Sequence, residues 1–379
     1  MIATLALTDF RSYRAAHLRV DAPIIVLHGA NGAGKTNVLE ALSLFTPGRG
    51  LRGATAPEIG RREPGETGGR AWAAALTLDG SDGEVRLGTG VQSAGAARRM
   101  VRIDGETAAP GRLLEHLRLV WATPEQDRLF SDSRAERLKF FDRLVFAADP
   151  SHAAAVAAYD KALRERLRLL VDGAEGRPAD PLWLDALEDR LASSGAAVAL
   201  ARTEALTALQ AAIDARADRP FPQAALALAG ETEQLAAEGA GADAVGARIR
   251  VGLQASRGRD GAAGRSLFGP HRADLTALHR EKNRSAAEGS SGEQKALALN
   301  LILAQIDRLA DGPARPLLLL DEAPAHLDAA RRAALFNEIE ALTAERGLQA
   351  FMTGTERTLF EGLEGRARFV TVIDGELRG

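Results

Sequence analysis

Gly29-Ala-Asn-Gly-Ala-Gly-Lys-Thr36 decides the fold, because it stands between the apolar run 24–27 and the amphipathic segment 37–45. It matches G-x-x-x-x-G-K-[ST] in the context that the motif needs, with a buried strand before it and a helix after it. Its glycines let the backbone curl so that several N–H groups point inward, and the new helix adds the positive end of its dipole. The stretch predicts a nucleoside triphosphate site; a glycine-rich turn with an incidental lysine is the alternative.

Within this loop each residue type has a role that suits a phosphate ligand. Lys35 is expected to reach the β- and γ-phosphates, and the Thr36 hydroxyl to ligate Mg²⁺. Arg11 is a further candidate through the base or ribose, although an exposed turn arginine is an equal alternative. The ATP-binding candidates are Asn31, Gly32, Ala33, Gly34, Lys35, Thr36, Asn37 and Arg11.

The composition sets limits on the class of protein. The 379 residues suggest two domains, or one domain with a large insertion. The net charge of −3 means that nucleic-acid binding cannot be argued from total charge. The absence of cysteine excludes disulfides and thiolate metal sites and fits a reducing cytosol. No apolar run looks long enough to span a bilayer, so we expect a cytoplasmic protein without a membrane partner.

The order of strand and helix patterns predicts an α/β head interrupted by a helical lobe. After the first helix, turn signals separate three strand-like stretches at 71–78, 84–91 and 100–104, which indicates an antiparallel β-layer. Helical periodicity then dominates, with helices expected at 134–147, 153–171 and 181–215 and a loop at 231–241. We therefore expect the head to comprise residues 1–126 and 253–379, and the inserted helical lobe to comprise residues 127–252.

Two carboxylates follow the all-apolar strand expected at 316–320. A parallel strand ending in Asp321-Glu322 would deliver both acids to the sheet edge where the phosphate loop lies. Asp321 suits a hold on Mg²⁺, and Glu322 suits polarisation of the attacking water. Gln126, just past the strand expected at 117–122, is a candidate to bridge Mg²⁺ and that water. Without the phosphate loop, surface acids and a solvated loop glutamine would be the better readings.

Ser290-Ser-Gly-Glu-Gln294 opens a helix and offers an anion a hydroxyl, backbone N–H groups and a helix dipole. One chain does not need two such phosphate sites. The economical explanation is that Ser291, Gly292, Glu293 and Gln294 bind the γ-phosphate held by a second copy, which would sandwich two ATP molecules in a head-to-tail dimer. An ordinary helix cap is the alternative for the pentapeptide alone.

Taken in order, these motifs resemble the Walker A, Q-loop, signature, Walker B and D-loop of ABC-type ATPases, with Asp328 of the stretch 325–328 as a third catalytic candidate. Lys35 and Ser291 are 256 residues apart, which is far more than in transporter subunits and fits the SMC-like branch. Within that branch the chain resembles the RecF family of bacterial DNA replication and repair proteins. The stretches that carry this resemblance are Phe10-Arg-Ser-Tyr13, Asn31-Gly-Ala-Gly-Lys-Thr-Asn37, Leu39-Glu-Ala41, Gly48-Arg-Gly-Leu-Arg52, Ser256-Arg-Gly-Arg-Asp260, Gly269-Pro-His-Arg272 and Ser291-Gly-Glu-Gln-Lys-Ala296.

The resemblance implies an ABC-type P-loop ATPase head, with a mixed core sheet and an antiparallel β-layer, that uses ATP and Mg²⁺. It implies a weak DNA-dependent ATPase that dimerises on ATP, binds gapped or junction DNA and helps RecO and RecR load RecA. Arg49, Arg52, Arg134 and Arg137 are DNA-binding candidates, although arginines on such surfaces are usually only solvated.

Two positions depart from related patterns. His326 stands where the RecF family commonly has Glu, and Thr353 stands where transporters have a switch histidine. The second departure suggests slow hydrolysis. A nucleotide-switched scaffold without a DNA clamp, or less readily an ABC motor subunit, remains an alternative function.

Overall fold

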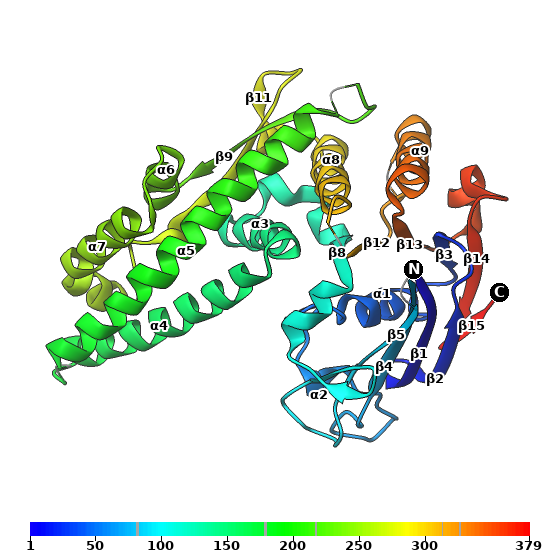
Figure 1. Cartoon of the computed structure of the whole chain (residues 1–379), viewed down its shortest axis with the longest axis horizontal. Coiled ribbons are helices and arrows are strands. Elements are labelled where there is room, and N and C mark those ends of the chain that lie inside the picture. The colour runs from blue at the N-terminus through cyan, green and yellow to red at the C-terminus, as the bar shows by residue number, and fades with distance from the viewer. Residues whose placement is uncertain (81–82, 178–179, 217, 313, 326) are drawn as a thin grey trace. The chain divides into compact units, whose positions relative to one another are not determined.

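A computed structural model describes residues 1–80, 83–177, 180–216, 218–312, 314–325 and 327–379 (Figure 1). His326 lies outside the described residues. Contacts divide the chain into two compact units. The first unit comprises Met1–Asp127, Asp218–Phe221 and Ala298–Gly379, and the second comprises Arg128–Ala217 and Pro222–Leu297.

The first unit contains a mixed six-stranded sheet in the order β15-β14-β3-β13-β12-β8. The five strands from β14 to β8 run parallel, and β15 pairs with β14 in the antiparallel sense. The central strands are almost entirely buried, which explains why they read as continuous apolar runs. The strands are β3 (Ile24–His28), β8 (Leu117–Ala122), β12 (Arg315–Leu320), β13 (Gln349–Gly354), β14 (Arg368–Ile373) and β15 (Glu376–Arg378).

A second, antiparallel sheet of this unit has the order β2-β1-β4-β5-β6-β7. The β-layer expected after the first helix is confirmed, and it continues through β1 and β2 from the start of the chain. That continuation could not be read from the sequence because β1 and β4 pair across about seventy residues. The strands are β1 (Ile2–Phe10), β2 (Tyr13–Arg19), β4 (Ala73–Gly80), β5 (Gly83–Gly90), β6 (Met100–Ile103) and β7 (Glu106–Thr107).

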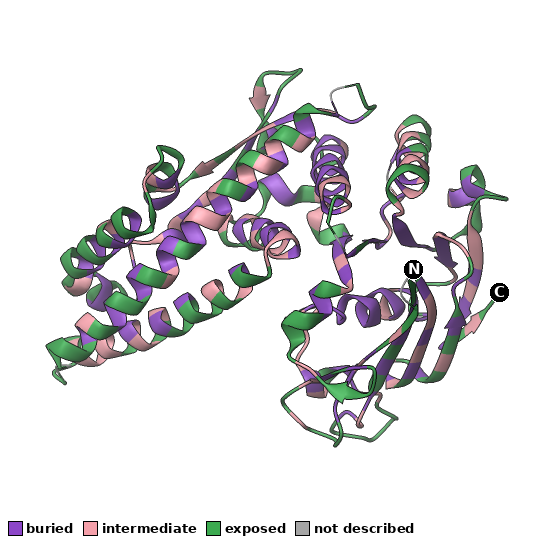
Figure 2. Ribbon diagram, in the orientation of Figure 1, coloured by how far each residue is buried: buried purple, intermediate pink, exposed green. Residues whose placement is uncertain are grey.

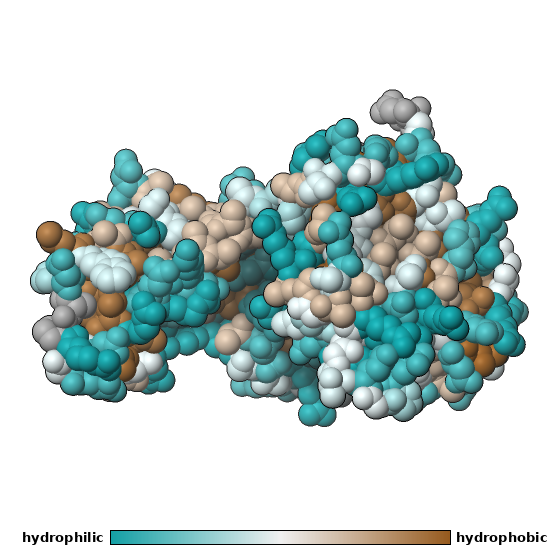
Figure 3. Space-filling model, turned by 90° about the horizontal axis from the view of Figure 1, so that it is seen from below, coloured by the Kyte–Doolittle hydropathy of each residue, from teal (hydrophilic) through white to brown (hydrophobic). Residues whose placement is uncertain are grey.

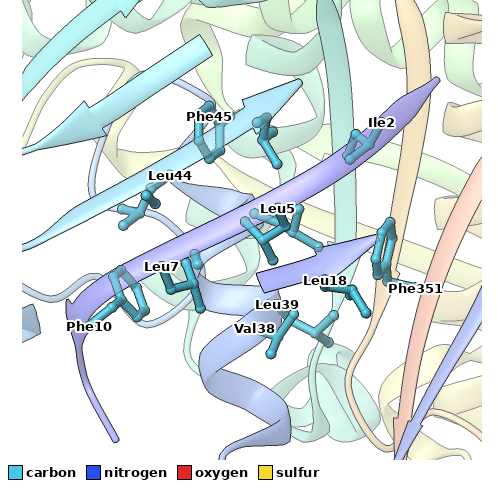
Figure 4. Packing of buried hydrophobic residues seen from close by; sticks show 14 of the residues in the cluster. Ile2, Leu5, Leu7, Phe10, Leu18, Val38, Leu39, Leu44, Phe45 and Phe351 are labelled. Carbon is cyan, nitrogen blue, oxygen red and sulfur yellow. The ribbon is translucent and has the colours of Figure 1, made fainter. Parts of the chain in front are cut away.

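One hydrophobic core joins the two sheets through α1 (Lys35–Ser43). Leu5 and Leu7 of β1 gather with Leu39 of α1 and Phe351 of β13 in this core (Figure 4). The strands β3, β8, β12 and β13 of the mixed sheet and helix α1 are largely buried, whereas β14 and β15 at the sheet edge are more exposed (Figure 2). The phosphate-loop helix is thereby fixed by packing on both sides. The other helices of the unit are α2 (Ala56–Ile59), α9 (Ala329–Arg346) and the 3₁₀ turns η1 (Pro110–Glu115) and η5 (Arg357–Leu363). Two elements belong to both units: η2 (Pro124–Ser131) begins in the first and ends in the second, and α8 (Ser291–Leu309) begins in the second and ends in the first.

The second unit is built on a helix cluster whose core includes Tyr159, Leu191 and Ile249. Asp149 and Asp180 each cap a helix that has proline at its first position. Helix α5 starts at the expected residue 181, whereas α4 starts three residues before the expected 153. The elements are α3 (Arg134–Ala148), α4 (Pro150–Ala174), α5 (Pro181–Asp214), β9 (Ala224–Ala229), α6 (Glu231–Ala237), α7 (Ala242–Ala263), η3 (Pro270–Arg272), β10 (Asp274–His279), β11 (Arg284–Ser285) and η4 (Ala286–Glu288).

Two features of the expected lobe are corrected by the structure. The expected boundary at residue 252 is wrong, because the second unit continues to Leu297. Helix α7 runs on to Ala263, where buried Asp260 pairs with Arg166 of α4, and a three-stranded sheet in the order β11-β10-β9 follows. The expected loop at 231–241 is also wrong, since α6 forms there and buries Thr232 and Ala236.

Helix α5 is long and apolar enough, by length and composition alone, to cross a membrane, contrary to the expectation from the sequence; 39% of its most apolar 18-residue stretch is buried. On this helix Arg202 is buried against Asp142 and Glu233, and Leu191 lies in the core of the unit. Packing inside the second unit therefore buries part of the apolar surface of this helix. Figure 3 shows one face of the surface, on which brown hydrophobic groups lie among teal hydrophilic ones.

Candidate nucleotide site and signature helix

The phosphate loop connects β3 to α1 in a conformation that requires glycine. Gly29 has φ +152° and Gly34 has φ +117°, and a Cβ on Gly29 would lie 2.2 Å from the Val372 carbonyl oxygen. Lys35 Nζ donates to the carbonyl oxygens of Gly29 and Ala30 at 2.8 Å each. Burial lowers the pKa of Lys35, while Glu322 and Asp321 act in the opposite direction. The lysine is thus held at the loop whose amides would receive a phosphate.

Three neighbouring parallel strands bring oxygen ligands to the same sheet edge. Asp321, directly after β12, accepts from the Thr36 hydroxyl at 2.9 Å and from the Thr353 hydroxyl at 2.7 Å. The Thr353 hydroxyl also accepts from the backbone N–H of Glu322 at 3.0 Å. Glu322 itself has φ +52°, a strained value for a residue with a Cβ. A threonine hydroxyl beside a carboxylate is the hard oxygen set that Mg²⁺ prefers, so these residues fit that metal.

Two other catalytic candidates point their side chains to local partners. The Asp328 carboxylate caps α9 by accepting from the Arg331 N–H at 2.8 Å. The Gln126 side-chain oxygen accepts from the Thr123 N–H at 2.7 Å and from its hydroxyl at 3.0 Å. Both residues follow strands that end at the same sheet edge as Asp321. Their side chains make hydrogen bonds to these local partners and not to Asp321.

Glu40 of α1 belongs to a stretch that carries the family resemblance, but its contacts were not predicted from the sequence. Its buried carboxylate accepts from Arg11 at 2.8 and 2.5 Å and from Arg52 at 3.1 Å. Arg11 also donates to the Glu58 carbonyl oxygen, and Arg52 to the Asn37 side chain, at 2.8 Å each. The signal was present, because Glu40 interrupts the apolar run of the helix. Both arginines are therefore held against the phosphate-loop helix by a carboxylate.

The signature stretch forms a capping box at the start of α8. The Glu293 carboxylate accepts from the Ser290 N–H at 2.7 Å, and the Ser290 hydroxyl accepts from the Glu293 N–H at 3.4 Å. Lys282 also donates to Glu293, and Arg284 does so at 2.7 Å. The Lys282 contact and the Ser290 N–H lower the pKa of Glu293 to about 2. The helix-cap reading is correct for Ser290 and Glu293, whereas Ser291 is exposed at the first helical position.

Gln294 ties the same helix to the end of η2. Its side-chain oxygen accepts from the Ser131 N–H at 3.1 Å, and its nitrogen donates to the Ser131 hydroxyl at 2.6 Å and to the Gly289 carbonyl at 3.0 Å. Glu293 and Gln294 thus hold the helix start in place. Ser291 and Gly292 are the signature residues left to face a ligand.

The four DNA-binding candidates differ in their surroundings. Arg137 makes a two-pronged ion pair with Asp274 at 2.8 and 2.6 Å, and Arg52 is held by Glu40. Arg49 is exposed and Arg134 half-buried, and neither has an ion-pair partner among the described residues. Arg49 and Arg134 are the better placed of the four to meet an external anion.

A phosphate loop after β3, Asp321 and Glu322 after β12, and a capped signature helix together define a P-loop ATPase of the ABC type. The model of the RecF/RecN/SMC N-terminal domain family matches residues 1–376. The chain is 59% identical to the DNA replication and repair protein RecF of Caulobacter sp. (strain K31), over 98% of this chain and 96% of that protein. It is 57% identical to the protein of the same name from Caulobacter vibrioides (strain ATCC 19089 / CIP 103742 / CB 15), over 99% and 97%. The chain belongs to the RecF family.

Solved structures share the fold at low sequence identity. The recombination mediator protein RecF with the ligand named ATPrS matches with a TM-score of 0.85 and 20% identity, covering 100% of this chain and 97% of that one. An SMC head bound to the C-terminal winged-helix domain of ScpA matches with a TM-score of 0.56 and 15% identity, over 100% and 96%. These likenesses confirm the fold of the expected ABC-type head, and the family model supports its SMC-like branch.

Proposed function

We propose that the chain is an ATP-dependent, DNA-binding recombination mediator of the RecF type. It dimerises head to tail on ATP, binds gapped or junction DNA, and helps RecO and RecR load RecA in the cytoplasm. The names of its relatives, DNA replication and repair protein RecF, support this function at 57–59% identity over nearly the whole chain. The observation that carries the dimer is exposed Ser291 at the start of a 19-residue helix, in a different unit from the phosphate loop.

The residues of the nucleotide site suit slow hydrolysis of ATP. Lys35 exchanges its carbonyl contacts for the β- and γ-phosphates, and the loop amides bind the same anion. Mg²⁺, held by Thr36 and Asp321, would neutralise charge on those phosphates. Glu322 polarises the attacking water from the position that its strained backbone fixes. Gln126 would join this site by giving up its contacts with Thr123.

The signature helix supplies the closing contact in the partner's site. The Ser291 hydroxyl and the first backbone N–H groups of α8 offer donors and a positive dipole end to a γ-phosphate. Because this contact exists only in the closed dimer, the closed form binds ATP more tightly than the open form, and ATP favours closure. Hydrolysis removes the γ-phosphate and with it this difference in affinity. A closed dimer that grips phosphates would bind DNA largely without regard to base sequence and in a salt-dependent way.

Sedimentation velocity with ATP and Mg²⁺ tests this proposal. The parent should sediment as a dimer with ATP and as a monomer without it. Lys35→Met should remain monomeric because it loses the phosphate contact, whereas Ser291→Arg should bind ATP normally and still fail to dimerise. A normal ATP-induced dimer of Ser291→Arg would refute the sandwich. An intact dimer with undetectable hydrolysis would instead favour the nucleotide-switched scaffold.

A further inference from the structure

The turn η3 in the second unit is held in place by hydrogen bonds to buried polar side chains. His271 donates from Nε2 to the Ser266 carbonyl oxygen at 3.1 Å, so its neutral ring accepts at Nδ1 from the Tyr159 hydroxyl at 2.8 Å. Burial lowers the pKa of His271, which favours this neutral form. The carbonyl oxygen of Pro270 accepts from buried Arg202 at 2.7 Å. The path of the chain through residues 266–271 is therefore fixed by side chains from α4 and α5.

Gly269 shows how closely this turn is fitted to its support. It has φ +125°, and a Cβ at this position would lie 2.2 Å from the Tyr159 hydroxyl. Only glycine adopts this positive φ without strain and leaves room for the Tyr159 hydroxyl. Because the backbone of this turn is fixed, the position from which the Arg272 side chain extends is also fixed. A binding site needs its side chains to be held in this way.

Two contacts bring three arginines from separate segments to this turn. The Arg137–Asp274 ion pair joins α3 to β10, so Arg134, one helical turn before Arg137, lies near Arg272, two residues before Asp274. His271 contacts Ser266, and this contact brings Arg272, the residue after His271, close to Arg265, the residue before Ser266. The side chains come from the start of α3, from the segment after α7, and from η3.

These three arginines have no acidic partner among the described residues. The nearby carboxylates are engaged elsewhere, since Asp274 pairs with Arg137 and Asp260 pairs with Arg166. Burial lowers the pKa of Arg272, and the charges of Arg134 and Arg265 lower it further. Like charges held together without counter-ions repel one another, so an anion that neutralises them would be stabilised.

We propose that Arg134, Arg265 and Arg272 form a phosphate-binding site for the nucleic-acid backbone. This inference rests on the proposed DNA-binding function and assigns it a surface within the second unit. Guanidinium groups suit it because each presents a planar fork of donors that matches two phosphate oxygens. The site reads backbone charge and carries no base specificity.

The test compares two triple variants of the full chain that remove the same charge. The first is Arg134→Gln with Arg265→Gln and Arg272→Gln. The control is Arg168→Gln with Arg190→Gln and Arg259→Gln, which changes exposed arginines of the same unit that have no ion-pair partner among the described residues. Binding to a gapped duplex is measured with ATP and Mg²⁺ at several salt concentrations. ATP-dependent dimerisation is measured alongside it, to show that both variants keep the fold and the nucleotide site.

Each lost phosphate contact should reduce the slope of log affinity against log salt by about 0.9. In the site variant, the magnitude of this slope should therefore fall by about 2 to 3 for each chain whose three arginines contact DNA. The control variant should keep the slope of the parent. Equal slopes in all three proteins, or equal losses in the two variants, would overturn the site while leaving DNA binding intact. A parent that does not bind DNA at all would overturn the proposed function and the site with it.

Discussion

Thr353 connects the two acids of the nucleotide site and is a positioning residue for both. It is fully buried, its hydroxyl donates to Asp321, and it accepts from the backbone N–H of Glu322. Loss of such a supporting hydrogen bond typically reduces metal affinity or activity by about 10- to 100-fold. Thr353→Val, which keeps the shape and removes the hydroxyl, should slow ATP hydrolysis by about that factor with little change in KM for ATP. Thr353→Ser should restore the rate; a Val variant that hydrolyses ATP as fast as the parent would show that Thr353 serves packing alone.

At the scale of elements, one buried arginine joins three helices of the second unit. Arg166 of α4 donates to Glu188 of α5 at 2.9 Å and to Asp260 of α7 at 2.7 Å, and all three side chains are 0% exposed. Arg166→Met would leave buried Asp260 without its arginine, while Glu188 would keep its ion pair with Arg257. Removing one partner of a buried ion pair typically costs about 3–5 kcal/mol. Urea unfolding should show this loss, whereas Arg168→Met, an exposed position on the same helix, should change stability little. Similar midpoints for the two variants would contradict the account.

The start of α8 gives a prediction about pH. The pKa of Glu293 is lowered from 4.5 to about 2, so its stabilising contribution is fully present above 4.5 and is lost as pH falls toward 2. Glu293→Gln removes the charge and should destabilise the parent by at most about 1 kcal/mol at pH 7, because the ion pairs lie near solvent. The difference in Tm between parent and variant should shrink as pH falls below 4.5. A difference that does not change between pH 7 and pH 3 would mean that the Glu293 charge is not what holds the helix start.

The same elements show what the sequence could and could not predict. Strands of the mixed sheet and the first helix were predictable because buried strands have continuous apolar runs and the phosphate loop has a fixed spacing. The role of Thr353 was not predictable from the sequence, since it depends on the register of β12 beside β13. Glu40 and the pairing of Arg137 with Asp274 were hidden for the same reason, because the partners are far apart in sequence. Local capping at Asp149 and Asp180 was readable, whereas α6 was missed because its seven residues are too few to show a helical period.

At the scale of the whole molecule, we propose that ATP converts the chain into a clamp on DNA. Each chain carries the phosphate loop in one unit and the exposed signature serine Ser291 in the other. In the proposed dimer, a second copy supplies the serine that completes each nucleotide site. Glu322→Gln should keep ATP binding and closure but slow hydrolysis, and it should therefore trap the closed dimer.

The most direct test is binding of the purified protein to a gapped duplex, with and without ATP and Mg²⁺, for the parent and for Glu322→Gln in parallel. Binding should appear only with ATP and should dissociate much more slowly in the variant than in the parent. Absence of DNA binding in both proteins, with ATP binding confirmed in the same samples, would contradict the clamp.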